Sequence, residues 1–144
     1  MDDLEKFMNY WMAHRPINSP MEMGLDYSGN LHGVVLFRDA PYQVQLFTVK
    51  PNSVIEPHIH PNVDSFEVFM TGDIEFSCDD QVFSQTSLGD TIRVLPTAWH
   101  GGKFGELGGC FLSIQKWLKG EPTSVGYDWD DKSHNTTGTA KNKD

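Results

Sequence analysis

The sequence lacks several features that would place it in large classes of proteins. Two cysteines, Cys78 and Cys110, are too few for a disulfide framework. No apolar run approaches the roughly 20 residues of a membrane span, and Met1-Asp2-Asp3 is acidic where a signal peptide would be basic. Basic residues are scarce as well: 11 Lys and Arg against 20 Asp and Glu give a net charge of −9. These absences predict a cytoplasmic protein that binds neither nucleic acid nor membranes.

The length and composition fit one domain with a packed interior. The chain has 144 residues, of which 38% are hydrophobic, and two domains would each be short of core. We expect residues 1–20 to form a helix and linker that pack on a β-barrel formed by residues 21–118. Residues 119–144 are rich in polar residues and are expected to form a C-terminal extension that ends in a loose tail from residue 132.

Residues 2–15 predict one amphipathic helix. Asp2 is suited to the N-cap, with Glu5 at the capping-box position three residues later. We expect the apolar stripe to pack on the domain, and a contact with a second copy, giving a homodimer, is the alternative. The stripe has helical spacing and consists of Leu4, Phe7, Met8, Trp11 and Met12.

After Pro20 the pattern changes to short apolar or alternating runs separated by turn residues. Such runs predict an all-β antiparallel sandwich or barrel. In residues 42–50 the apolar and polar positions alternate, and the sequence leaves open which set faces inward. The glycines of residues 101–109 predict a flexible hairpin. The expected strands are 33–38, 42–50, 65–71, 74–78, 81–83, 90–95 and 110–118.

Three of the six histidines are candidate metal ligands. His58 and His60 flank Ile59, and on a strand residues i and i+2 point to the same face. Two imidazoles placed in this way can bind one metal ion. His100 follows a predicted strand, where it could turn toward the first two.

The pattern of residues around these histidines resembles the two sequence motifs of the cupin superfamily. Its first motif has a glycine, five residues, His-x-His, a glutamate and a closing glycine; here Asn52 takes the first glycine position and Gly72 the last. Its second motif resembles Gly89–His100. The resemblance implies an antiparallel double-stranded β-helix, the jelly-roll barrel of cupins, with a metal held by His58, His60 and His100.

The glutamate of the first motif is missing, because Ser65 takes its position. Glu67 has the same strand parity but lies about 6.6 Å further along the strand, which suits a catalytic proton-transfer group. Asp64 has the opposite parity and would need a bulge to turn inward. Either carboxylate could be a fourth ligand, and Glu67 could instead pair with Arg93 or Arg38.

Three neutral imidazoles suit Fe, Zn, Ni and Cu. Because the thiol dioxygenases of the cupin superfamily hold Fe(II) with three histidines, the resemblance implies one divalent ion, Fe(II) first and Zn, Mn or Ni as alternatives. We expect a dioxygenase-type oxidoreductase acting on a small organic substrate, with isomerase or lyase chemistry second. The other hypotheses are a non-catalytic cupin that binds ligands or serves as an accessory module, and a metal-free structural barrel.

Overall fold

A computed structural model describes residues 1–18, 23–25, 30–84, 88–125 and 130–131. It confirms the predicted all-β fold with an N-terminal helix. The expected tail, residues 132–144, lies outside the described residues. The elements are α1 (Asp3–His14), β1 (Met23–Leu25), β2 (Leu31–Asp39), β3 (Tyr42–Val49), β4 (Val54–Ile59), β5 (Val63–Cys78), β6 (Gln81–Ser84), β7 (Thr91–Val94), β8 (His100–Trp117) and β9 (Asp130–Asp131).

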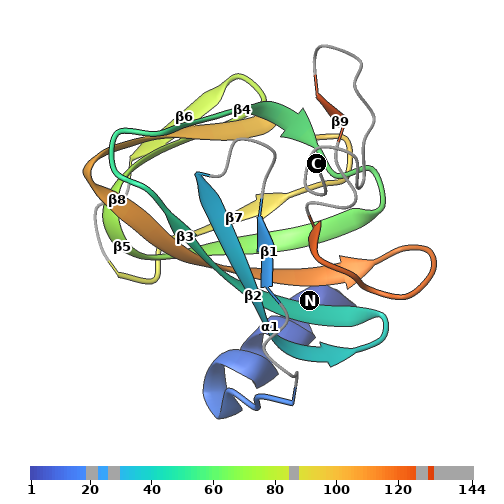
Figure 1. The fold of residues 1–144 in the computed structure, drawn as a ribbon. Coiled ribbons are helices and arrows are strands. Elements are labelled where there is room, and N and C mark those ends of the chain that lie inside the picture. Colours follow the sequence, from blue (N-terminus) through green and yellow to red (C-terminus); the bar gives the residue numbers. More distant parts are fainter. Residues whose placement is uncertain (19–22, 26–29, 85–87, 126–129, 132–144) are drawn as a thin grey trace.

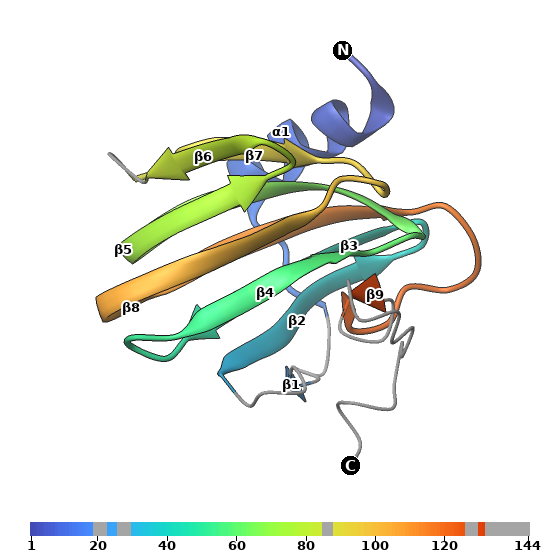
Figure 2. The ribbon, with the colours of Figure 1, turned by 90° about the horizontal axis from the view of Figure 1, so that it is seen from above.

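The strands form two layers that share the long strands β5 and β8 (Figures 1 and 2). The first layer has the order β1-β2-β3-β8-β5-β7 and uses residues 63–72 of β5 and 109–117 of β8. The second layer has the order β9-β4-β8-β5-β6 and uses residues 74–78 of β5 and 100–104 of β8. All of these pairings are antiparallel, as a jelly roll requires.

Two of the predicted turns are wrong, because β5 and β8 bend without ending. The expected turn at Thr71-Gly72-Asp73 lies inside β5, and the expected hairpin of residues 101–109 belongs to β8. Gly72 has a φ of +118° and Gly108 one of +65°, and a side chain at Gly72 would collide with the backbone of Gly108. These glycines therefore allow two paired strands to bend together where they approach closely.

The helix α1 packs on the outer face of the first layer, as predicted (Figure 1). Asp2 is its N-cap and forms the predicted capping box with Glu5. Arg93 of β7 pairs with Asp2 at 2.9 Å and so fixes the start of the helix to the sheet. The buried residues of this outer cluster are Leu4, Trp11, Leu36, Val44, Phe66, Val68, Leu112 and Ile114.

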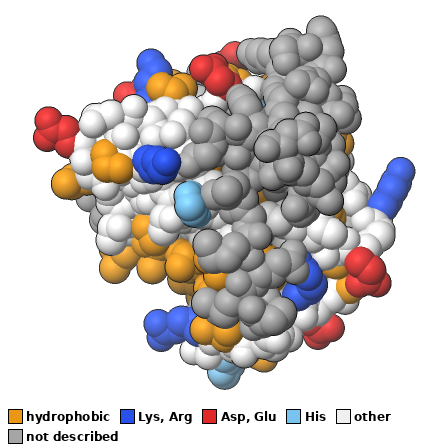
Figure 3. All heavy atoms as spheres, viewed as in Figure 1, with side chains coloured by type: hydrophobic (Ala, Val, Ile, Leu, Met, Phe, Trp, Pro, Cys, Tyr) orange, Lys and Arg blue, Asp and Glu red, His pale blue; other side chains and the backbone are white. Residues whose placement is uncertain are grey.

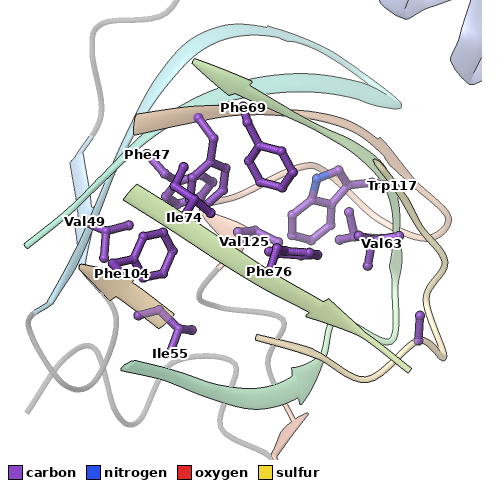
Figure 4. Close-up of a cluster of buried hydrophobic side chains, with 13 residues drawn as sticks. Phe47, Val49, Ile55, Val63, Phe69, Ile74, Phe76, Phe104, Trp117 and Val125 are labelled. Carbon is purple, nitrogen blue, oxygen red and sulfur yellow. The ribbon is translucent and has the colours of Figure 1, made fainter. Parts of the chain in front are cut away.

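The second hydrophobic cluster fills the interior between the two layers (Figure 4). Phe69 of β5 contacts both Phe76 and Phe111, with ring centroids 5.4 and 6.1 Å apart. Because β5 contributes Phe69 to one layer and Phe76 to the other, these aromatic contacts hold the layers together.

The surface of the described residues carries both signs of charge. Acidic and basic side chains are intermixed on the face shown in Figure 3. None of the helices in the described part of the chain has the length and apolar character of a membrane-spanning helix.

Trp11→Ala tests whether the helix is part of the domain core. Trp11 is only 3% exposed, so we expect the substitution to lower the free energy of unfolding by about 3–5 kcal/mol. Tyr10→Ala, at an exposed position of the same helix, is the control and should cost less than about 1 kcal/mol. Urea denaturation measures both, and equal effects would show that the helix does not contribute to the core.

Candidate metal centre

The structure brings His58, His60 and His100 together. His58 is in β4 and His60 follows the end of that strand, while His100 begins β8 and is the direct cross-strand partner of His58. The ring centroids lie 4.3 Å apart for His58 and His100, 4.8 Å for His58 and His60, and 5.2 Å for His60 and His100. Residues separated by forty positions in the sequence therefore meet, as the resemblance to cupins implied.

Two of the rings are oriented by their own strands. The Nδ1 atom of His58 lies 2.7 Å from the carbonyl oxygen of Glu56, and that of His100 lies 3.0 Å from the carbonyl oxygen of Ala98. A carbonyl oxygen only accepts, so each Nδ1 carries the proton and donates it. The lone pair of each ring is then on Nε2, the arrangement typical of metal-binding histidines.

Burial favours the neutral form of His100. Its side chain is 5% exposed, and burial lowers the pKa of His100 from 6.5 to about 4, against the opposing effects of the hydrogen bond to Ala98 and the charge of Asp79. At neutral pH this imidazole is therefore uncharged, which is the form that can bind a metal.

The donor set fits a divalent transition metal. One ligand atom from each of the three rings lies within 4.8 Å of the others, and nitrogen ligands about 2.1 Å from one ion lie roughly 3–3.4 Å apart. Modest rotations of the rings would therefore complete the site. In the described part of the chain, no Asp, Glu or Cys belongs to this group.

Glu67 lies in the interior, as its parity predicted, but outside the histidine group. It is 7% exposed, and its Oε2 atom has no hydrogen-bond partner among the described residues. Burial raises the pKa of Glu67 from 4.5 to about 7, opposed by hydrogen bonds from the hydroxyls of Ser113 and Ser65. Glu67 therefore changes charge close to neutral pH, which suits a group that transfers protons.

Asp64 forms the pair with Arg93 that the sequence suggested for Glu67. Its two carboxylate oxygens accept hydrogen bonds from Arg93, at 2.8 Å from Nε and 2.6 Å from Nη2. Asp64 and Asp2 together raise the pKa of Arg93. Because Asp64 is in this bidentate pair, it is not directed at the histidines, and the suggested pairing of Glu67 with Arg93 is wrong.

Cys78 is a neighbour of the site that the sequence did not reveal. It is partly buried against the interior cluster and is the cross-strand partner of His100. Burial raises the pKa of the Cys78 thiol, and the charges of Asp79 and Glu67 add to this effect. The surroundings of Cys78 therefore disfavour its thiolate form.

Six polar side chains form a regular array on the inner face of the first layer, which we call the polar array. Gln43, Gln115 and Ser65 are one row of cross-strand partners over β3, β8 and β5. The next row, by the same registers, consists of Gln45, Ser113 and Glu67. All six are buried. The polar positions of β3 therefore face inward, and Val44 faces the helix.

Comparison with solved structures shows the cupin fold. KdgF from Halomonas sp. superposes with a TM-score of 0.60 at 13% identity over 72% of this chain and 95% of that chain. An RmlC-like cupin from Shewanella frigidimarina gives 0.58 at 18% over 67% and 84%. The DMSP lyase DddQ from Ruegeria pomeroyi gives 0.61 at 11% over 80% and 74%.

Comparisons by sequence add nothing to this result. No family model matches the chain, and no curated protein matches it. Identities this low show a shared fold and leave the substrate and the reaction to be argued from the residues of this chain.

Glu67→Gln tests the environment of the buried carboxyl group. Because the pKa of Glu67 is raised in the folded protein, its contribution to stability is complete below pH 4.5 and is lost as the pH rises through about 7. We expect the metal-free protein to lose about 3 kcal/mol more stability than the variant over this range.

Urea denaturation at a series of pH values measures the difference. Glu75→Gln, at an exposed position of the same strand, is the control and should follow the unaltered protein. Parallel stability curves for the unaltered protein and Glu67→Gln would contradict the raised pKa.

Proposed function

The chain has the cupin fold, and from that premise we propose that it is a metal-dependent enzyme acting on a small organic substrate. His58, His60 and His100 would hold one divalent ion, and Glu67 would be the catalytic acid or base. Dioxygenase-type oxidation with Fe(II) is the reaction that we propose first, and Zn, Mn and Ni are the alternative ions.

The observation that carries this proposal is the convergence of the three rings, two of which, His58 and His100, present Nε2 as the ligand atom. The centroid distances of 4.3–5.2 Å come from residues on two different strands. The backbone carbonyls that orient His58 and His100 are part of the same strands or adjoin them. A structural histidine needs no shared point with two other rings, and a hydrogen bond from the second ring nitrogen to a backbone carbonyl is typical of metal-binding histidines.

A bound ion with three neutral ligands keeps its double positive charge and could activate oxygen or polarise a substrate. The residues of this chain would supply the rest. Glu67 would hold a proton at Oε2 or accept one there, because its pKa of about 7 lets both charge states exist at neutral pH. The aromatic ring of Phe76, 6.0 Å from that of His100, would exclude water on one side of the site.

Lyase or isomerase chemistry is the second candidate function. The observation that favours it is Glu67, since a buried carboxylate with a near-neutral pKa is suited to removing a proton from carbon. One protein of similar fold is a DMSP lyase, which shows that the fold accommodates such chemistry.

Metal content tests the site itself. We expect gently purified protein to carry about one metal ion per chain, and His100→Ala to weaken binding by at least about a hundredfold, because it removes a ligand atom rather than an outer partner. His32→Ala, at a histidine outside the group, is the control and should leave the stoichiometry unchanged. Elemental analysis that finds no metal in the unaltered protein would favour the structural-barrel hypothesis.

Oxygen consumption separates the reaction classes. With protein loaded anaerobically with Fe(II), we expect at least one compound from a panel of thiols and small carboxylic acids to cause oxygen uptake that His100→Ala abolishes. Turnover of a panel compound without oxygen uptake would favour the lyase or isomerase. If Fe(II)-loaded protein binds panel compounds without converting any of them, it would be a ligand-binding module.

A further inference from the structure

The polar array raises the question of what its side chains bind. A buried amide or carboxyl group is costly unless it is hydrogen bonded. Within the array, Gln43 Nε2 donates to Gln115 Oε1 at 2.9 Å, and Gln115 Nε2 donates to Gln45 Oε1 at 3.0 Å. The three glutamines are therefore linked, but each amide has more hydrogen-bonding capacity than these links use.

Part of that capacity is taken by the chain's own C-terminal extension. We call residues 122–125 the C-terminal strap. Gln43 Nε2 donates to the carbonyl oxygen of Thr123 at 2.5 Å, and Gln45 Nε2 donates to Ser124 Oγ at 3.1 Å. The backbone N–H of Val125 donates to Gln45 Oε1 at 2.9 Å. The strap thus occupies the glutamine side of the array with a carbonyl, a hydroxyl and an N–H group.

The strap reaches this position because the end of β8 is fixed. The N–H of Leu118 donates to the carbonyl oxygen of Asn62 at 2.9 Å, and Asn62 Nδ2 donates to the carbonyl oxygen of Lys119 at 2.6 Å. Gly120, with a φ of +69°, then turns the chain back toward the interior. The anchored turn determines where the strap begins, and the hydrogen bonds to the array hold the strap in place.

The strap and the candidate metal centre both adjoin the interior cluster. Val125 belongs to this cluster together with Trp117 and Phe76 (Figure 4), and the ring of Phe76 is 6.0 Å from that of His100. Further along the chain, β9 pairs with β4, where Asp131 is opposite His58. The described residues that follow β8 therefore include a strand paired directly with the strand that carries His58.

The opposite side of the array holds an oxygen atom to which none of the described residues donates a hydrogen bond. Glu67 is the third member of the row that contains Gln45 and Ser113, and this atom is its buried Oε2. An interior packed only for stability would satisfy this atom or replace it with an apolar group. This oxygen could accept a hydrogen bond from a ligand group that enters the array.

The polar contacts also make the strap easy to displace. Hydrogen bonds to glutamine amides can be exchanged for bonds to water or to a ligand at little net cost, because each group keeps a partner. The buried apolar side chains of the strap are Pro122 and Val125, so withdrawal would expose these two side chains and the surface that they cover.

We propose that the C-terminal strap is a displaceable occupant of a ligand site formed by the polar array. It opens locally while the strands stay folded, and it admits small molecules that carry hydroxyl and carbonyl groups, the groups that the glutamines now hold in the strap. The inference rests on the proposed function, since it takes the neighbouring histidines to be the reactive centre.

Residue-level hydrogen exchange of the full-length, metal-free protein tests local opening. The probes are the Val125 amide, the Trp117 indole N–H, which donates to Gln115 Oε1 at 3.0 Å, and the Ile114 amide of β8. We expect the protection factors of the first two probes to be about a hundredfold lower than that of the Ile114 amide. Such a difference is expected when a segment opens without global unfolding. Equal protection of all three, with equal dependence on urea, would overturn the proposal.

Two substitutions in the same hydrophobic cluster sharpen this test. Val125→Ala removes contacts of the strap, and Val49→Ala removes equivalent contacts of a strand. We expect Val125→Ala to speed exchange of the Trp117 indole about tenfold and to leave Ile114 unchanged. Val49→Ala should instead lower global stability and speed exchange at Ile114. The same response of all probes to both substitutions would contradict a separately opening strap.

Metal extraction tests whether the opening controls access. From zinc-loaded protein, EDTA should remove zinc about tenfold faster in Val125→Ala than in the unaltered protein, in proportion to the gain in opening. An unchanged rate despite faster exchange would show that the strap does not control access. Failure of the unaltered protein to bind zinc would count against the proposed function, and the exchange data would still decide whether the strap opens.

Discussion

The antiparallel pairing of β5 with β8 runs through both layers of the sandwich and connects His100 with the polar array. In the second layer the pairing sets Cys78 opposite His100, and in the first it sets Glu67 opposite Ser113. The two strands can serve both layers because Gly72 and Gly108 let them bend together at close approach. One continuous ladder thus fixes the distance between the histidines and the polar array.

The interior combines two environments that are usually kept apart. Aromatic side chains such as Phe69 and Phe76 exclude water, and this burial keeps His100 neutral and holds a proton on Glu67 up to about pH 7. The polar array places hydrogen-bonding groups in the same space. A low-dielectric interior with fixed polar groups strengthens electrostatic interactions with a bound ligand, which is a property useful to an enzyme and costly for a purely structural barrel.

The sequence predicted those features that depend on local spacing. The alternation of residues along a strand put His58 and His60 on one face, and the capping box predicted the start of α1; the structure confirms both. Asn52, which takes the place of the first motif glycine, has a φ of +57°. Glycine and asparagine both tolerate this left-handed backbone, so the replacement of one by the other predicted it.

Features that depend on distant contacts could not be predicted in this way. Gln43 and Val44 are both fully buried, so the alternation in β3 could not tell the face under the helix from the face toward the interior. Glycines 101, 102 and 105 suggested a hairpin because nothing local reveals that β4 and β5 lie against them. The pairing of Asp64 with Arg93 joins strands far apart in the sequence, and only the register of β5 and β7 brings them together.

The central claim is that three imidazoles bind one ion through Nε2, with Nδ1 of His58 and His100 donating to the backbone. Nitrogen-15 NMR of the histidine rings during a zinc titration tests it most directly. We expect the Nε2 resonances of His58, His60 and His100 to shift together and to saturate at one zinc per chain, while Nδ1 of His58 and His100 stays protonated. Shifts confined to one or two of these rings, or coordination of His58 or His100 through Nδ1, would contradict it.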